Sequence, residues 1–467
     1  MNFEIFDALE CVCGQREFRL RDGVIASTTV RKQVTQVLCT KFCGYRNRPV
    51  ISGNVTPADC QECRTRMILQ GAIQCSCGRG WRIQDGSPQF SLPTSSKPDE
   101  SGLRVVRIDH HSDPRWRPFV AAHPEGTIFH HPGWMRILED EYHRQSIVLA
   151  CEDENGKLAA LLPLVYTRGF PLVGEQRTKR RISSLPRTPV SGPLSISPGA
   201  SLRLLRAAID LVNRDRHLQL EIKTQTPEFD GLVDGLARVT RNPSFVLKLP
   251  AKAEELQLGD SRSRRHHIRG AVNKALRSGV QVRPAETEQE LRDWYELYLD
   301  SMRRRVVPAR PFRLFAAMWE TLRPRGQMEL LLAEKSEAGT CGLLAGSIFL
   351  KFGRTVFYSF TGCRREDFSL HPHDLIQWHA IHGAVRDGFL RYDFGEVPEE
   401  APLLANFKSK WGAKESSLCR YYYPMPDRLE LRGLPVHPWS KRLVSSVWQK
   451  LPLPLTARLG DWLYSFL

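Results

Sequence analysis

The chain has 467 residues, and its 67 Lys and Arg against 51 Asp and Glu give a formal net charge of +16. Hydrophobic residues make up 41% of the chain and charged residues 25%, which excludes a wholly disordered or fibrous protein. The length favours two to four domains, and the positive charge predicts an anionic partner such as a phosphate, a nucleic acid or a membrane face.

The N-terminal residues MNFEIFDALE are acidic and lack the apolar core of a secretory signal. The sequence also lacks a run of about 18 apolar residues, the length that a membrane-spanning helix requires. We therefore expect a cytoplasmic protein. Peripheral contact with the inner face of the membrane stays open, because the chain is strongly basic.

Residues 1–90 hold eight of the twelve cysteines in four close pairs: Cys11, Cys13, Cys39, Cys43, Cys60, Cys63, Cys75 and Cys77. Two thiolates separated by one to three residues reach a single Zn²⁺ from a tight turn, and two such pairs complete a tetrahedron. In a chain without a secretion signal, paired cysteines favour metal over disulfides. The pattern predicts two structural zinc ions, paired sequentially or crossed. The alternative is a set of buried cysteines without metal.

The stretch from Cys60 to Pro88 contains Cys60-Gln-Glu-Cys63, Cys75-Ser-Cys77 and Trp81-Arg-Ile83. It resembles the small zinc-ribbon domain of methyltransferase activator subunits. The resemblance implies a module that supports a partner or a neighbouring catalytic domain. The following residues, 91–103, are rich in Ser and Pro and are predicted to be a linker.

Two similar α/β modules are predicted next, at 104–250 and 251–424. In the first, strands at 146–151 and 158–165 flank a hairpin signal, and a helix at 201–213 precedes a strand at 218–222. The second repeats strands, helix and strand, with strands at 328–333, 343–350 and 355–360, a helix at 373–387 and a strand at 390–394. Residues 425–467 are expected to form an amphipathic tail that contains three tryptophans.

The segment 261–279 carries six Lys and Arg and no acid. Apolar Ile268, Val272 and Leu276 recur every four residues, which predicts an amphipathic helix with a cationic face, and Ser261 is its expected N-cap. A face of one sign favours phosphate binding, although a simply solvated face is the alternative. The candidate phosphate ligands are Arg264, Arg265, Arg269 and Lys274.

Residues 391–412 form a third candidate site. A strand ends at Gly395, and Phe407-Lys408 and Trp411-Gly412 follow after a short connection. A lysine held between Phe407 and Trp411 would stabilise a developing oxyanion in acyl transfer. We assign that part to Lys408 and make Asp393 a candidate base or orienting residue. The alternative is a surface lysine beside core aromatics.

Several motifs occur together in a characteristic order over 104–424. They are Phe129-His-His-Pro-Gly-Trp134, the basic segment ending in Ser278-Gly279-Val280, Phe357-Tyr-Ser-Phe360-Thr-Gly362, Tyr392-Asp393-Phe394-Gly395 and Phe407-Lys408…Trp411-Gly412. This region resembles the FemAB-type branch of the GNAT acyltransferase superfamily, and the tail resembles the end of FemAB-like proteins associated with exopolysaccharide loci.

The resemblance implies tandem GNAT-like modules that transfer an acyl or aminoacyl group to an amine, often on a lipid-linked cell-wall precursor. Aminoacyl-tRNA is the donor in well-known members, so tRNA is an expected partner. Trp134, Phe407 and Trp411 become candidates for substrate binding.

One segment departs from acyl-CoA-dependent GNAT enzymes, which have a Gly-rich loop that cradles the donor's pyrophosphate. Residues 361–373 offer only Gly362, while Arg364 and Arg365 supply charge for direct anion contacts. The donor is left open between acyl-CoA and aminoacyl-tRNA. Two alternatives remain: an acyl-CoA-dependent N-acyltransferase acting on a small amine or amino sugar, and a zinc-ribbon nucleic-acid-binding protein.

Overall fold

The computed structural model describes residues 100–142, 144–167, 180–186, 188–215, 217–337, 340–426 and 445–464, and the backbone of eight short strands before residue 92. The early strands are β1 (Glu17–Leu20), β2 (Ile25–Ser27), β3 (Val34–Cys39), β4 (Arg48–Val50), β5 (Met67–Leu69), β6 (Gly71–Gln74), β7 (Gly80–Gln84) and β8 (Ser87–Ser91). They pair as one sheet in the order β2-β1-β6-β7-β8 and a second in the order β4-β3-β5. The predicted zinc ligands lie outside the described residues, apart from the backbone of Cys39 in β3.

The rest of the described chain is built on one mixed sheet with the order β16-β17-β18-β19-β20-β15-β21-β14-β12-β11-β10-β9, and β13 pairs with β11. Its first-half strands are β9 (Arg104–Ile108), β10 (Ser146–Glu152), β11 (Leu158–Thr167), β12 (Arg180–Ser183), β13 (Leu194–Ser195), β14 (Leu218–Thr224) and β15 (Ala237–Lys248). Those of the second half are β16 (Val280–Pro284), β17 (Met328–Glu337), β18 (Thr340–Phe352), β19 (Thr355–Cys363), β20 (Arg391–Glu396) and β21 (Lys414–Tyr423). The predicted α/β class is confirmed.

The first half follows the expected order of elements. The β10–β11 hairpin forms as predicted, and α4 (Pro198–Asn213) connects the parallel strands β12 and β14. Ser197 caps α4 by accepting a hydrogen bond from the backbone N–H of Ala200. Two further helices, α2 (Trp116–Ala122) and α3 (Pro132–Tyr142), lie between β9 and β10 in the chain.

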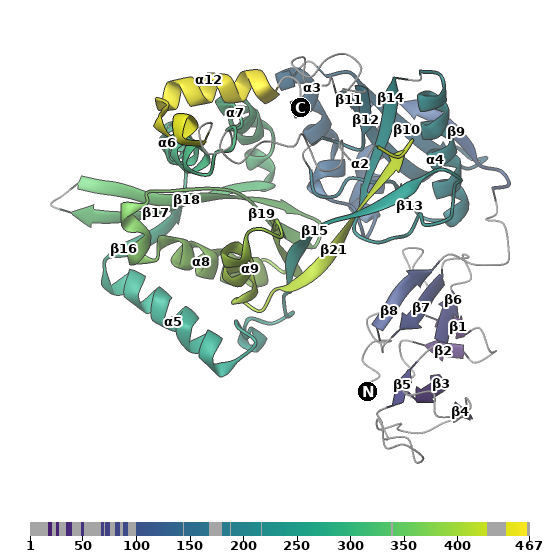
Figure 1. Cartoon of the computed structure of the whole chain (residues 1–467), viewed down its shortest axis with the longest axis horizontal. Coiled ribbons are helices and arrows are strands. Elements are labelled where there is room, and N and C mark those ends of the chain that lie inside the picture. Colours follow the sequence, from purple (N-terminus) through teal and green to yellow (C-terminus); the bar gives the residue numbers. More distant parts are fainter. Residues whose placement is uncertain are drawn as a thin grey trace.

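The second half repeats this plan. Helix α8 (Pro372–Arg386) connects the parallel strands β19 and β20, and β17, β18 and β19 form an antiparallel meander. Helices α6 (Glu288–Arg304), α7 (Phe312–Thr321) and α12 (Leu453–Tyr464) lie on one side of these strands. Helices α5 (Arg262–Arg277), α8 and α9 (Pro402–Ser409) lie on the other side (Figure 1).

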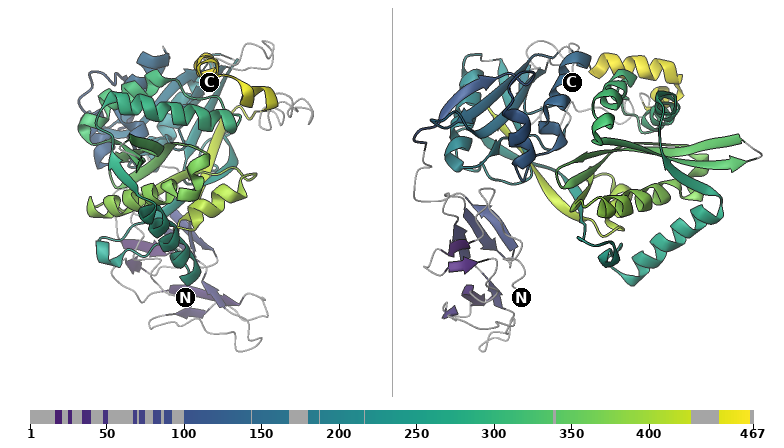
Figure 2. Two further views of the ribbon diagram at one scale, coloured as in Figure 1. Left: turned by 90° about the vertical axis from the view of Figure 1, so that its left-hand side faces the viewer. Right: turned by 180° about the vertical axis from the view of Figure 1, so that it is seen from behind.

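Strands β15 and β21 join the two halves into a continuous sheet, as the right-hand view of Figure 2 shows. β21 pairs with β14 of the first half, for example Ile222 with Tyr421. β15 comes from the first half in sequence but pairs with β20, for example Val246 with Asp393. The hydrophobic core also crosses the seam, because Trp134 and Met135 belong to the same buried cluster as Trp294 and Phe315. Among the described helices, none is both long and apolar enough to cross a membrane.

Candidate functional site

The parallel strands β19 and β20 pair over three positions only, from Thr355 with Arg391 to Phe357 with Asp393. Beyond these positions the strands separate, and a cavity of about 410 Å³ lies beside the gap. Tyr358, Ser359 and Phe360 line it from β19, and Asp393, Gly395 and Glu396 line it from β20. The first half contributes Phe129, Trp134, Thr188, Pro189, Glu221 and Lys223. The cavity therefore lies at the seam between the two halves.

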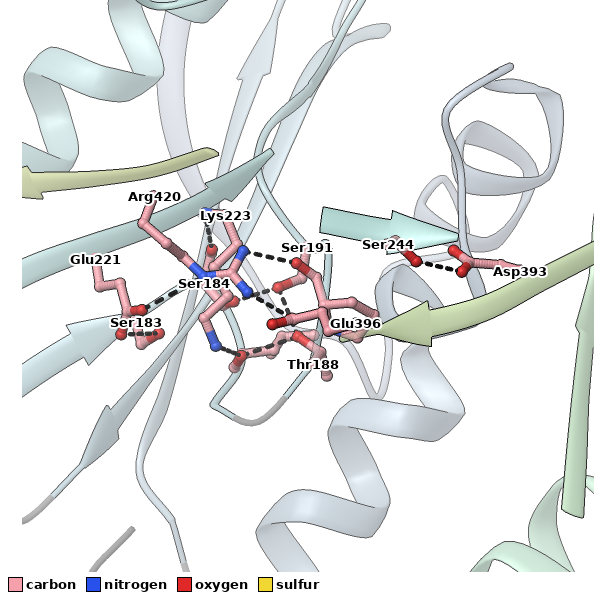
Figure 3. Close-up of polar contacts among 12 residues, drawn as sticks. Ser183, Ser184, Thr188, Ser191, Glu221, Lys223, Ser244, Asp393, Glu396 and Arg420 are labelled. Atoms are coloured by element: carbon pink, nitrogen blue, oxygen red, sulfur yellow. Dashed lines mark hydrogen bonds and ion pairs between the residues drawn. The ribbon is translucent and has the colours of Figure 1, made fainter. Parts of the chain in front are cut away.

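Buried charged groups line this seam cavity, as Figure 3 shows. Arg420 is 6% exposed, and its guanidinium donates to Glu396 at 2.8 Å and to the carbonyl oxygen of Pro189 at 2.8 Å. Nζ of Lys223 donates to the carbonyl oxygen of Leu185 at 2.7 Å. Arg420 of the second half is thus hydrogen-bonded to the backbone of the first half at the cavity wall.

Asp393 is a buried carboxylate at the end of the paired part of β20. Its Oδ1 accepts hydrogen bonds from the Ser244 hydroxyl and from the backbone N–H of Gly395, the latter at 2.7 Å. Burial raises the pKa of Asp393 above its ordinary value, although these hydrogen bonds and the nearby charge of Lys408 oppose the shift. An oriented carboxylate with a raised pKa suits proton acceptance or the orienting of a substrate amine.

Lys408 lies directly behind the cavity wall. Its Nζ donates to the carbonyl oxygens of Gly395 at 2.9 Å and Glu396 at 3.0 Å. Burial lowers its pKa to about 8. Gly395 has a φ of 79°, and a Cβ added there would lie 3.8 Å from this Nζ. Gly395 and Glu396 both line the cavity, so the ammonium group is hydrogen-bonded to two residues of the cavity wall.

The local surroundings predicted for Lys408 belong instead to Lys410. Residues 402–409 form helix α9. The Nζ of Lys410 lies 4.6 Å from the ring centroid of Phe407 and 5.5 Å from that of Trp411, and it forms an ion pair with Asp374. The prediction of Lys408 between these two aromatics is therefore wrong. A helix advances about 100° per residue, so residues two apart do not simply alternate as they would in a strand.

A second cavity, of about 250 Å³, lies near the N-terminal end of α8 and is lined by Ser301, Arg304, Arg305, Thr361, Gly362, Cys363, Arg365, Phe368 and His373. Three arginines make it attractive to anions. Burial lowers the pKa of His373 to about 4, so its imidazole is neutral at pH 7. A Cβ at Gly362 would lie 2.5 Å from the backbone nitrogen of Tyr298, which restricts this position to glycine.

The predicted site residues are distributed over three places. Trp134 and Asp393 line the seam cavity, and the indole Nε1 of Trp134 is buried without a hydrogen-bond partner. Arg365 lines the arginine cavity, whereas Arg364 does not. Phe407 and Trp411 line neither cavity, and Trp411 is fully buried in the core.

The basic helix is confirmed as α5, with Ser261 as its N-cap. Its side chains line neither of these two cavities. Arg264 contacts Asp260 and the carbonyl oxygen of Ser409, and Arg265 donates to the carbonyl oxygen of Gly259. Arg269 and Lys274 are exposed. The free part of the cationic face therefore lies in the later turns of α5.

Sequence reasoning missed Arg304 and Arg305 in the arginine cavity, and Lys223 and Arg420 in the seam cavity. A signal was present for each pair. Arg304 and Arg305 belong to a run of three arginines at the end of a helix. Lys223 follows the buried Ile222 on β14, and Arg420 lies between the buried Cys419 and Tyr421 on β21. An ionisable side chain among such neighbours is costly without a specific partner.

Comparisons with known proteins agree with this topology. Residues 262–409 match the family model for an acetyltransferase (GNAT) domain. The chain is 21% identical over 311 residues to a UDP-N-acetylmuramoylpentapeptide-lysine N(6)-alanyltransferase from Weissella viridescens, covering 62% of this chain and 84% of that protein. It also resembles a crystal structure of FemX, with a TM-score of 0.54 and 15% identity, covering 70% of this chain and 99% of that one.

A more distant structural neighbour is the C-terminal domain of a putative lysylphosphatidylglycerol synthetase from Agrobacterium fabrum, with 10% identity and a TM-score of 0.44, over 66% of this chain and 90% of that one. The GNAT match and the similarity to an alanyltransferase identify the chain as an acyltransferase with a tandem GNAT-like fold.

Proposed function

We propose that this enzyme transfers an activated acyl or aminoacyl group to an amine on a cell-envelope or exopolysaccharide precursor. The observation that carries the proposal is the seam cavity, where β19 and β20 separate beside Asp393 and in front of Lys408. The likeness to an alanyltransferase that acts on a muramoylpentapeptide lysine supports an amine acceptor of this class. An acyltransferase domain also weighs against a purely nucleic-acid-binding function.

The arginine cavity is the proposed site for the donor's phosphate groups. It is lined by residues 361–363 of β19, and the seam cavity is lined by residues 357–360 of the same strand. A donor anchored by Arg304, Arg305 and Arg365 would therefore lie along β19, with its reactive carbonyl at the gap between β19 and β20. Direct charge from three arginines would replace the backbone amides of a Gly-rich loop.

The acceptor amine would attack this carbonyl from the seam cavity, beside Trp134. A C–N bond forms, and collapse of the tetrahedral intermediate breaks the bond to the donor's ester oxygen or thioester sulfur. The amine loses a proton and the leaving oxygen or sulfur gains one. Asp393 is the proposed group that orients the amine or accepts its proton. Holding both reactants in one cavity is itself a large part of catalysis.

Lys408 would stabilise the oxyanion through its charge. Its ammonium group is buried behind Gly395, and a fixed charge in such surroundings acts more strongly than one at the surface. Two of its three N–H groups are used by the carbonyl oxygens of Gly395 and Glu396. The same contacts hold the end of β20 in place.

A donor competition tests the proposed function. Purified full-length protein is incubated with an amine-bearing muramoylpentapeptide precursor and either aminoacyl-tRNA or acyl-CoA, and the product mass is measured. We expect the mass of an aminoacyl group to be added from aminoacyl-tRNA. Transfer from acyl-CoA alone would identify the CoA-dependent alternative. Failure of both donors, with small amines and amino sugars as well, would overturn the assignment.

A further inference from the structure

A cluster of metal-binding side chains lies in the first half, and its members line neither the seam cavity nor the arginine cavity. Asp109, His110 and His111 follow directly after β9, and Glu139 comes from α3. Oε2 of Glu139 lies 2.7 Å from Nε2 of His110 and 3.1 Å from Nε2 of His111. One carboxylate oxygen is thus approached by two imidazole nitrogens.

Hydrogen bonding alone leaves this cluster incompletely satisfied. His110 is 8% exposed, and its buried Nε2 has no hydrogen bond of acceptable geometry, although Glu139 is close. The two imidazole rings are held with centroids 3.9 Å apart. A buried nitrogen whose geometry suits an ion pair with Glu139 but not a hydrogen bond calls for an explanation, which a bound ion would supply.

We propose that His110, His111 and Glu139 bind a Zn²⁺ ion through Nε2, Nε2 and Oε2, with water in the fourth position. Two neutral imidazoles and a carboxylate form an established type of ligand set for zinc. Ligand atoms about 2.0–2.1 Å from a tetrahedral ion are roughly 3.3 Å apart. The present separations of 2.7 and 3.1 Å would need to open by about 0.6 and 0.2 Å, respectively.

Asp109 would orient this site. Its Oδ1 accepts a hydrogen bond from the backbone N–H of His111 at 3.0 Å and lies 3.9 Å from Nδ1 of His110. At this distance Asp109 acts on His110 through its negative charge, which would increase the basicity of a ligating imidazole. Together with Glu139 it offers two negative charges to a divalent cation. The side chain of His111 is 47% exposed, which gives the ion a path from solvent.

The ion would tie the turn after β9 to α3. The first turn of α3 carries Trp134, which lines the seam cavity. Zinc would therefore stabilise one wall of that cavity from outside it. This inference rests on the cluster alone and not on the proposed reaction.

The test compares metal content and thermal stability of the full chain with those of two variants. His111→Ala removes a half-exposed ligand, and Glu139→Gln removes the carboxylate while keeping its shape. The N-terminal cysteines are also expected to hold zinc. The relevant quantity is therefore the difference in zinc content per chain between wild type and each variant. We expect wild-type protein to bind one more zinc ion per chain than either variant, and added zinc to raise the midpoint of thermal unfolding in wild type only.

The matched control is His267→Ala, which removes an exposed histidine beside His266 on α5. It should bind as much zinc as wild type. Cobalt(II) separates the two kinds of site, because the ion lost in the variants should lack a thiolate charge-transfer band. Circular dichroism verifies that each variant is folded, and His111→Gln replaces any alanine variant that is not. Equal metal content in wild type and both folded variants would overturn the proposal.

Discussion

At the scale of single residues, the proposed role of Lys408 depends on its contact with Gly395. Gly395 lines the seam cavity, and its carbonyl oxygen accepts a hydrogen bond from the buried ammonium group of Lys408. The two carbonyl oxygens that accept from this ammonium group also fix its position. A charge fixed in this way needs no rearrangement when an oxyanion forms.

Lys408→Met should therefore lower the rate of transfer by about 10², near the lower end of the loss seen when one oxyanion donor is removed. The lower end is expected because the charge acts across the backbone of Gly395. Single-turnover rates with saturating donor measure the effect. Lys410 is unsuitable as the control, since it is paired with Asp374, whereas Lys414 is exposed. Equal rates for Lys408→Met and Lys414→Met would show that Lys408 has no part in catalysis.

The pH dependence of Lys408 has opposite signs for activity and stability. Burial lowers its pKa from 10.5 to about 8. Between these values the unfolded chain binds a proton that the folded chain has released, so this residue makes the free energy of unfolding rise with pH. The positive charge of Lys408, which is proposed to stabilise the oxyanion, is lost over the same pH range. The rate should therefore fall above about pH 8 while this contribution to stability increases. The Lys408→Met variant should show neither this fall in rate nor this gain in stability.

At the scale of elements, α5 presents charge that its own contacts do not use. Arg264 and Arg265 are tied to neighbouring groups at the start of the helix, so replacing them would disturb the fold. The double substitution Arg269→Ala and Lys274→Ala should instead weaken binding of a phosphate-bearing donor several-fold and reduce the salt dependence of binding. Arg386→Ala, at an exposed position on α8, is the control. If the affinity for the donor and its dependence on salt are both unchanged, the cationic face of α5 is only solvated and does not bind phosphate.

The N-terminal strands are expected to depend on metal. Eight cysteines in four close pairs predict about two thiolate-bound zinc ions per chain. Metal analysis of the purified protein, combined with the cobalt charge-transfer band, measures them separately from the histidine site proposed above. Chelation should make residues 1–90 sensitive to protease while residues 104–424 stay resistant. A metal-free chain with a resistant N-terminal region would contradict this expectation.

At the scale of the whole molecule, Arg420 connects the two halves. It lies on β21 and contacts Glu396 on β20 and Pro189 in the first half. Arg420→Met should lower the free energy of unfolding by about 3 kcal/mol, because it leaves a partly buried carboxylate and a carbonyl without their donor. Urea denaturation measures the loss. The matched control is Arg238→Met, because the ion pair of Arg238 with Asp230 is exposed. This substitution should lower the free energy of unfolding by roughly 0–1 kcal/mol. Similar losses for both would contradict the role given to the seam.

The sequence by itself determined the elements whose hydrogen bonds are local. Ser261 and the four-residue spacing of apolar side chains predict α5 to within a residue or two at each end, and the turn signal at 154–157 predicts the β10–β11 hairpin. Such elements depend on neighbours in the chain, so periodicity and capping are sufficient to locate them. The repeated order of strands, helix and strand likewise predicts the two similar halves.

Only the tertiary structure decided where the chemistry lies. The seam cavity lies where β19 and β20 separate beside the first half, and β15 and β21 join the two halves there. No local pattern encodes which strands will pair across long separations. The arginine cavity combines Arg304 and Arg305 at the C-terminal end of α6 with Arg365 after β19, and the histidine cluster combines a turn with a distant helix. Lys410, and not Lys408 as predicted, lies beside Phe407 and Trp411. The direction of a side chain follows from its element and from what packs against it, and both depend on the whole fold.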